Sequence, residues 1–175
     1  VELIDEGCVV ISQHSDTKGP AVACENSKRA VPAYHVGYSQ SMTDIAPTRS
    51  LVSCSVDYSY YFEQSINALL HGKKIEDCID GKVSGQDAMA GIEKGWVRIL
   101  DINYEILPEN IDSTVKSVSS KIEKNDIAIF SGNFTGTAPF DSSNKIDLRT
   151  PFIENEKSSS PAFCYVLDDV IKILP

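Results

Sequence analysis

The alternation of apolar and polar positions predicts a strand, a helix and a second strand in the first part of the chain. The apolar run over 8–12 is short and rich in β-branched residues, which is typical of a buried strand. Gly19 and Pro20 then mark the first turn of a helix, because proline lacks an N–H that a first turn leaves unpaired anyway. A second strand is predicted over 31–36. This order forms a βαβ unit whose loops lie at one edge of the sheet.

Apolar residues at helical or alternating spacing predict the later elements and an α/β fold class. The predicted elements are strands over 49–56, 96–100 and 126–130, and helices over 58–70, from Pro108 and from Ser160-Pro161. The apolar stripe of the helix over 58–70, which is expected to face the core, is Tyr58, Tyr61, Phe62, Ile66, Leu69 and Leu70. The stripe of the last helix is Phe163, Val166, Leu167, Val170 and Ile171. The glycine-rich segment 73–95 predicts short strands or hairpin-like loops.

Length and charge limit the classes of function. A chain of 175 residues holds one ordinary domain or two small lobes. With 16 basic and 25 acidic residues the net charge is −9, and no basic patch is visible, so no nucleic-acid partner is expected. Neither a signal peptide nor a long apolar run is visible. The opening residues Val1–Gly7 resemble the last turn of a helix, so we expect a processed product or a fragment.

The five cysteines do not predict a metal or redox site. No pair has the C-x-x-C spacing of zinc or thioredoxin-like sites. Cys8, Cys24, Cys54 and Cys164 lie among apolar neighbours and are expected to be small buried hydrophobes. No phosphate-binding loop is present either, so neither a cofactor nor a metal is predicted.

Polar and aromatic residues follow the predicted strands at their carboxyl ends. In open α/β sheets this edge, beside helix N-termini, is where ligands bind. The candidate ligand-binding residues are His14, Ser15, Asp16, Thr17, Tyr38, Ser39, Asp57, Tyr58 and Trp96. A second interpretation stays open, in which Asp16, Thr17 or Asp57 only caps the helix that follows it. Trp96 is equally compatible with a core position.

A series of short motifs runs along almost the whole chain. They are Leu3-Ile4-Asp5-Glu6-Gly7, Val9-Val10-Ile11-Ser12-Gln13-His14-Ser15-Asp16, Gly37-Tyr38, Tyr60-Tyr61, Leu69-Leu70-His71-Gly72, Gly91-Ile92-Glu93-Lys94-Gly95 and Ile129-Phe130-Ser131-Gly132. In this order and spacing they resemble the basic membrane protein (Bmp) family of ABC-transporter substrate-binding lipoproteins. Members of that family look like binding proteins for purines or purine nucleosides, and the resemblance implies their two-lobed, type I periplasmic-binding-protein fold.

The resemblance implies a division of the chain between two partial lobes, each with a parallel sheet flanked by helices. Residues 1–36 would belong to the C-terminal lobe, 37–92 to the N-terminal lobe, and 93–175 to the remainder of the C-terminal lobe. The chain would correspond to the C-terminal half of a family member. Ser41 stands where similar members usually carry aspartate, and Val56 and Tyr58 stand where many carry tryptophan. The ligand or its affinity is therefore expected to differ.

The resemblance also implies a function, namely the solute-binding component of an ABC importer. A purine or purine nucleoside would bind between the lobes, with a carboxylate on the ribose hydroxyls and an aromatic ring on the base. The expected partners are an ABC permease and either a missing N-terminal half or a second copy of the chain. The expected location is extracytoplasmic, as a membrane-anchored lipoprotein or a periplasmic protein.

Two other classes of function remain as alternatives. A nucleoside-processing enzyme would use His14 as a base oriented by Asp16, but the chain has no Gly-x-Ser-x-Gly elbow and no metal-ligand cluster. We therefore expect no enzymatic activity. A sensing module of a signalling protein would use the same fold and would need an attached transmembrane or signalling segment.

Overall fold

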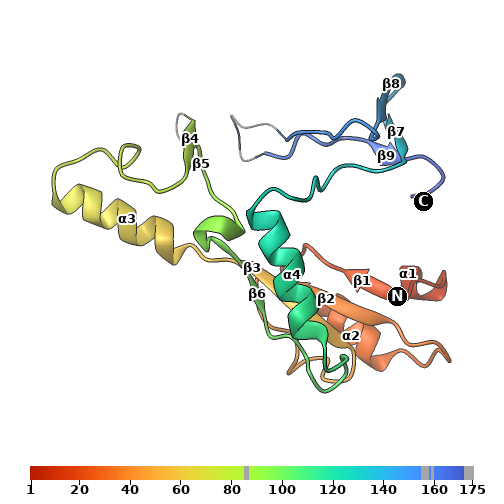
Figure 1. The fold of residues 1–175 in the computed structure, drawn as a ribbon. Coiled ribbons are helices and arrows are strands. Elements are labelled where there is room, and N and C mark those ends of the chain that lie inside the picture. The colour runs from red at the N-terminus through yellow and green to blue at the C-terminus, as the bar shows by residue number, and fades with distance from the viewer. Residues whose placement is uncertain (85–86, 155–157, 159, 172–175) are drawn as a thin grey trace. The chain divides into compact units, whose positions relative to one another are not determined.

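The computed structural model describes residues 1–84, 87–154, 158 and 160–171 (Figure 1). The elements of this part are α1 (Glu2–Asp5), β1 (Val10–Ser12), α2 (Gly19–Asn26), β2 (Tyr34–Tyr38), β3 (Ser50–Val56), α3 (Ser59–Leu70), β4 (Lys82–Ser84), β5 (Asp87–Met89), the 3-10 helix η1 (Ile92–Lys94), β6 (Val97–Leu100), α4 (Ile111–Glu123), β7 (Thr135–Ala138), β8 (Asp141–Asp147) and β9 (Val166–Leu167).

A mixed sheet in the order β1-β2-β3-β6 carries the first part of the fold. Strands β1, β2 and β3 run parallel, and β6 runs antiparallel to β3. The βαβ unit predicted from sequence is confirmed, with α2 beginning at Gly19 and Pro20 in its first turn. Strand β2 lies later than predicted, over Tyr34–Tyr38. Pro32, which lacks an N–H, lies before it.

Helices cover both faces of this sheet. On one face Ile11 of β1 packs with Cys24 of α2, and Ala21 of α2 packs with Met42 and Ala46. On the other face the first turns of α4, with Ile111 and Val115, lie over β2, β3 and β6. An apolar hollow of about 270 Å³ remains there. The sheet is therefore a layer between helices, as in α/β proteins with buried parallel strands.

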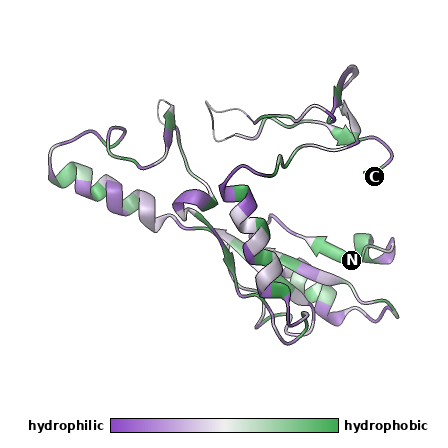
Figure 2. Cartoon of the chain, in the orientation of Figure 1, coloured by the Kyte–Doolittle hydropathy of each residue, from purple (hydrophilic) through white to green (hydrophobic). Residues whose placement is uncertain are grey.

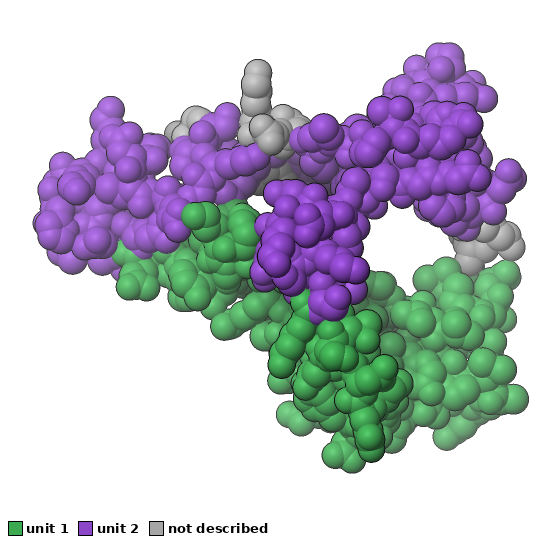
Figure 3. All heavy atoms as spheres, viewed as in Figure 1, with its two compact units in different colours: residues 1–63, 90–116 green, residues 64–89, 117–175 purple. Residues whose placement is uncertain are grey.

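The chain forms two compact units (Figure 3). The first contains residues 1–63 and 90–116, and therefore the mixed sheet. The second contains residues 64–89 and 117–175. The lobe boundaries implied by the family resemblance are a different division of the chain and stay a prediction.

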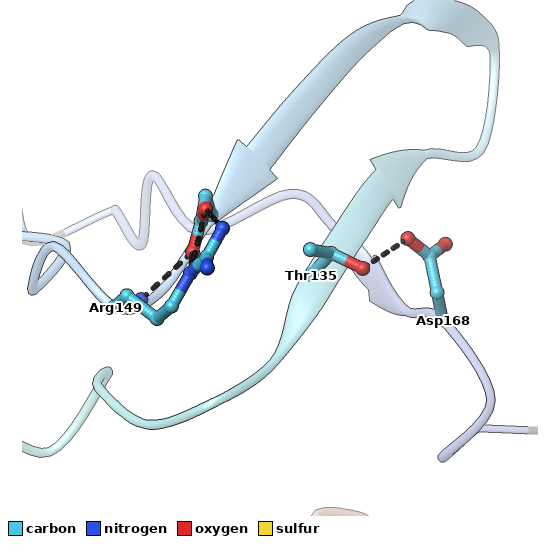
Figure 4. A network of polar contacts seen from close by, with 4 residues as sticks. Thr135, Arg149 and Asp168 are labelled. Atoms are coloured by element: carbon cyan, nitrogen blue, oxygen red, sulfur yellow. Dashed lines mark hydrogen bonds and ion pairs between the residues drawn. The ribbon is translucent and has the colours of Figure 1, made fainter.

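The second unit has two small antiparallel sheets. Strands β4 and β5 pair as predicted for the glycine-rich segment, with residues 85–86 outside the described part. Strands β8, β7 and β9 form the other sheet. The carboxylate of Asp168 accepts hydrogen bonds from the hydroxyls of Thr135 at 2.8 Å and Thr137 at 2.9 Å. Figure 4 shows the bond from Thr135 and, beside it, Arg149, which pairs with Asp147.

Two predictions for the last part of the chain are wrong. The segment that begins at Ser160-Pro161 forms no helix within its described residues, because Val166 and Leu167 pair with β7 as β9. Residues 126–130 form no strand either. The ring of Phe130 instead stacks on Phe163, with ring centroids 4.8 Å apart. An aromatic cluster and a strand, rather than an amphipathic helix, organise this segment.

Figure 2 shows apolar residues along α3. Apart from the half-buried Tyr61, the predicted apolar stripe of this helix is exposed, contrary to the prediction that it faces the core. Phe62 is 59% exposed and Leu70 is 78% exposed. Only Ser65 and Ala68 of this helix are buried. Helical spacing shows that one face is apolar, but it does not show what covers that face.

The predictions for the cysteines are confirmed in part. Cys24 is buried and Cys8 is half-buried, but Cys54 and Cys164 are exposed. Among the described residues, no helix is both long enough and apolar enough to cross a membrane.

Candidate functional site

The register of the sheet brings the ends of four strands to one edge. Ser12 pairs with Val36, so the residues after β1 and the last residues of β2 lie side by side. Val56 at the end of β3 pairs with Val97 at the start of the antiparallel β6. The backbone N–H of Asp57 donates a 2.6 Å hydrogen bond to the carbonyl of Trp96. The structure thus places all the candidate binding residues at the carboxyl edge of the parallel strands.

His14 and Tyr38 form a stacked aromatic pair at this edge. Their ring centroids are 4.0 Å apart, and their planes are inclined by 25°. His14 is exposed, whereas Tyr38 is half-buried. The pair presents a flat polarisable surface to solvent, which suits stacking on a planar ligand.

The carboxylate of Asp16 has no partner in the part of the chain that the structure describes, whereas Thr17 makes a hydrogen bond at the start of α2. The hydroxyl of Thr17 accepts a 3.2 Å hydrogen bond from the N–H of Gly19. Within the described residues, Asp16 makes no hydrogen bond or ion pair, and its side chain is exposed, as are those of Ser15 and Thr17. Lys18 stands at the N-cap of α2 and no side chain caps this helix, so the Thr17 bond closes only the turn that leads into it and Asp16 does not act as a cap either.

Ser39 adopts a strained backbone conformation directly after Tyr38. Its φ is 71°, which residues with a side chain rarely adopt, and its N–H donates a 2.7 Å hydrogen bond to the carbonyl of Cys54. Backbone strain of this kind occurs preferentially at functional sites. The turn ends β2 and exposes the Ser39 side chain.

Asp57 is held by groups from two elements. Its Oδ1 accepts hydrogen bonds from the hydroxyl of Ser59 at 2.5 Å and from the N–H of Ser59 at 3.1 Å, which caps α3. Its Oδ2 lies 2.9 Å from Nη1 of Arg98 in β6. The Ser59 bonds and, to a lesser extent, the Arg98 charge hold the pKa of Asp57 below its ordinary value. This carboxylate is ionised but already partnered.

Trp96 and Tyr58 differ in accessibility. Trp96 is 6% exposed and packs edge-on against Tyr61, with ring centroids 6.1 Å apart. This contact fits the interpretation of Trp96 as a core residue beside the edge. Tyr58 is 62% exposed at the start of α3 and is the more accessible aromatic ring.

Two buried polar residues beneath the edge were not among the candidates. Gln13 is 8% exposed, and its Oε1 lies 2.8 Å from Nε2 of the fully buried His35 in β2. Gly37 lies next to them, and a Cβ added there would come within 2.2 Å of the Ser53 hydroxyl. The sequence signal for this group is the presence of Gln13 and His35 at alternating, core-facing positions of two strands.

Comparison with known proteins places the chain in a family. The family model of the ABC transporter substrate-binding proteins of the PnrA-like type, Bmp, matches residues 1–131. The chain belongs to the Bmp family. The match covers the mixed sheet and its carboxyl edge, and it ends before residues 132–175, whereas the motif resemblance extended over almost the whole chain. A search of curated proteins found no significant relative.

Membership of the Bmp family gives the general function. A Bmp protein binds a solute and works with an ABC transporter, and members of the family are generally not enzymes. The family implies a periplasmic-binding-protein-like fold, with which the helix-flanked, mostly parallel sheet agrees, and an extracytoplasmic location. The ligand is not specified by the family match.

Proposed function

We propose that this Bmp protein binds a purine or purine nucleoside at the carboxyl edge of its mixed sheet. The observation that carries the proposal is the exposed carboxylate of Asp16, which has no partner among the described residues and follows His14 of the His14–Tyr38 stack by two positions. A carboxylate accepts both hydroxyl protons of a ribose, and a flat aromatic surface covers a base.

The other candidate residues take supporting roles in this proposal. Tyr58 offers an exposed ring after β3, and Ser15 and Ser39 offer exposed hydroxyls next to the two residues of the aromatic stack. Asp57 contributes negative charge while capping α3, and Trp96 supports the edge from below. Thr17 keeps α2 aligned with the loop.

The complete binding site would lie between two lobes of a type I periplasmic-binding-protein fold, as in a membrane-anchored lipoprotein that delivers its ligand to a permease. The opposing surface would come from an N-terminal half or from a second copy of the chain. Supporting this, β1 is the outermost strand of the mixed sheet, and Val9 and Val10 are 48% and 51% exposed. An open parallel edge is normally covered.

Isothermal titration calorimetry with adenosine, inosine, guanosine and adenine tests the proposal. Asp16→Ala should weaken binding by about ten- to hundredfold, because a charge-assisted hydrogen bond is lost. Glu109→Ala, in an exposed position before α4, is the control and should leave the affinity unchanged. Failure of all four compounds to bind the wild type would exclude the purine assignment. Normal affinity of Asp16→Ala would exclude the role of this carboxylate.

A further inference from the structure

Gln13 attaches the loop over 14–17 to the interior of the sheet. Its Nε2 donates hydrogen bonds to the carbonyls of Ser15 at 2.9 Å and Thr17 at 3.0 Å. Its Oε1 meets Nε2 of His35 at 2.8 Å. All three distances are those of ordinary hydrogen bonds. The side chain therefore links a buried residue of β2 to two backbone groups of the loop.

These partners fix the orientation of the amide and the tautomer of the imidazole. Two carbonyl acceptors require the NH₂ group of Gln13 on the loop side, so its oxygen faces His35. An amide oxygen only accepts, and His35 must therefore carry a proton on Nε2. Its Nδ1 is buried without a hydrogen-bond partner among the described residues. Burial also lowers the pKa of His35, so the ring is neutral.

The two anchored carbonyls flank Asp16 on either side. Ser15 and Thr17 are its chain neighbours, so holding their carbonyls toward Gln13 limits the directions available to the intervening residue. Within the described residues, Asp16 has no hydrogen bond of its own that would restrain it. The loop lies on the surface, where backbone segments without such anchors are mobile.

We propose that Gln13 and His35 are positioning residues for the ligand, with His35 orienting the Gln13 amide and Gln13 orienting the loop that carries Asp16. The proposal rests on the proposed function of this edge. Neither side chain touches the ligand. Their effect on affinity comes from preorganisation, because a loop that is already ordered loses less conformational freedom on binding.

Matched variants separate this role from a general effect on folding. Gln13→Glu keeps the acceptor for His35 but places a carboxylate oxygen against two carbonyl oxygens. His35→Gln keeps an N–H donor near the position of the imidazole Nε2, whereas His35→Leu removes it. Asn67→Asp makes the same amide-to-carboxylate change at an exposed position of α3 and controls for the added charge.

Calorimetry with adenosine gives the first measurement, with urea unfolding of each variant alongside. Gln13→Glu and His35→Leu should weaken binding by about tenfold or more, and His35→Gln should restore most of the affinity. Asn67→Asp should bind like the wild type. Unchanged affinity of a folded Gln13→Glu variant would overturn the proposal, as would equal losses in His35→Gln and His35→Leu.

NMR of the unliganded chain gives a second measurement that does not depend on the identity of the ligand. The ring ¹⁵N shifts of His35 should report the neutral Nε2–H tautomer, and ¹⁵N relaxation of Asp16 should show greater backbone motion in Gln13→Glu than in the wild type. The opposite tautomer, or unchanged motion, would refute the positioning role. If these signatures are present but adenosine does not bind, the loop is positioned as proposed and the purine assignment fails.

Discussion

The imidazole of His14 lies against the phenol ring of Tyr38, with the centroids 4.0 Å apart. The two residues come from different strand ends, and the parallel pairing of β1 with β2 brings them together. One face of Tyr38 is therefore already occupied within the protein. A planar ligand would stack on the outer face of this pair or displace the exposed imidazole.

Replacement of Tyr38 tests whether the ring or its hydroxyl is used. Tyr38→Phe keeps the stacking surface and should bind adenosine within about threefold of the wild type. Tyr38→Leu should bind it about tenfold or more weakly, because base–aromatic stacking contributes about 1–3 kcal/mol in nucleic-acid binders. Calorimetry on both variants decides this, and equal affinities would show that the aromatic surface is not part of the site.

Asp57→Ser separates helix capping from a direct contact with the ligand. Serine is an effective N-terminal capping residue, so the melting temperature should stay close to that of the wild type. The carboxylate that pairs with Arg98 is removed, and affinity for a nucleoside should fall if Asp57 contributes charge to the site. Thermal unfolding and calorimetry are the two measurements. A stable variant with wild-type affinity would leave Asp57 as a cap alone.

Gly37→Ala should destabilise the protein, because the added Cβ would lie 2.2 Å from the Ser53 hydroxyl and 3.1 Å from its Cβ. Overpacking of this kind costs about 1–3 kcal/mol of unfolding free energy. Ser53→Ala should recover part of that loss in the double variant, because it removes the closer atom. On its own Ser53→Ala should be nearly neutral, since this hydroxyl is buried without a partner among the described residues. Urea unfolding of the three variants measures these effects, and additive losses would contradict the clash.

His35 should make stability depend on pH. Burial lowers its pKa in the folded protein from the ordinary 6.5, so the unfolded chain binds the proton more tightly. The free energy of unfolding should therefore be greatest above about pH 6.5 and fall as the pH drops from there toward the folded pKa. Urea titrations at about pH 7.5 and pH 5.5 measure this. The decrease should be smaller in His35→Gln, and an identical decrease would assign it to other groups.

Ser39→Gly should relieve backbone strain. Glycine adopts a φ of 71° without steric cost, so the variant should be as stable as the wild type or more stable. If the Ser39 hydroxyl contacts the ligand, its affinity should fall while the melting temperature does not. Thermal unfolding that shows a clear loss of stability would contradict the strain inferred here.

The sequence predicts the βαβ unit well, because its signals are local. Gly19 and Pro20 begin α2, and the β-branched run before them forms β1. Parallel strands then place their carboxyl ends together, so the position of the candidate edge followed from element order alone. The extent of α3 was also predicted closely, because the helix ends at Leu70 and Gly72, with a φ of 64°, follows it.

The parts that could not be predicted depend on contacts between distant residues. Phe163, Val166 and Leu167 fit helical spacing, but Phe163, Tyr165 and Leu167 equally fit the alternation of a strand. Pairing with β7 decides between them. The bond between Gln13 and His35 joins residues that are 22 positions apart, and no local pattern reports it. Likewise, the spacing of the stripe on α3 does not reveal that Phe62 is exposed.

The hydrogen bond from the N–H of Asp57 to the carbonyl of Trp96 joins the two ends of the segment 57–96, which lies outside the mixed sheet. The chain leaves the sheet after Val56 and returns at Val97, and these residues are direct register partners. Residues 57–96 are therefore a long connection between two antiparallel neighbours, in the place where a hairpin has its turn. A connection of this kind can change in length while the pairing of β3 with β6 is preserved, so variation within 57–96 leaves the mixed sheet intact.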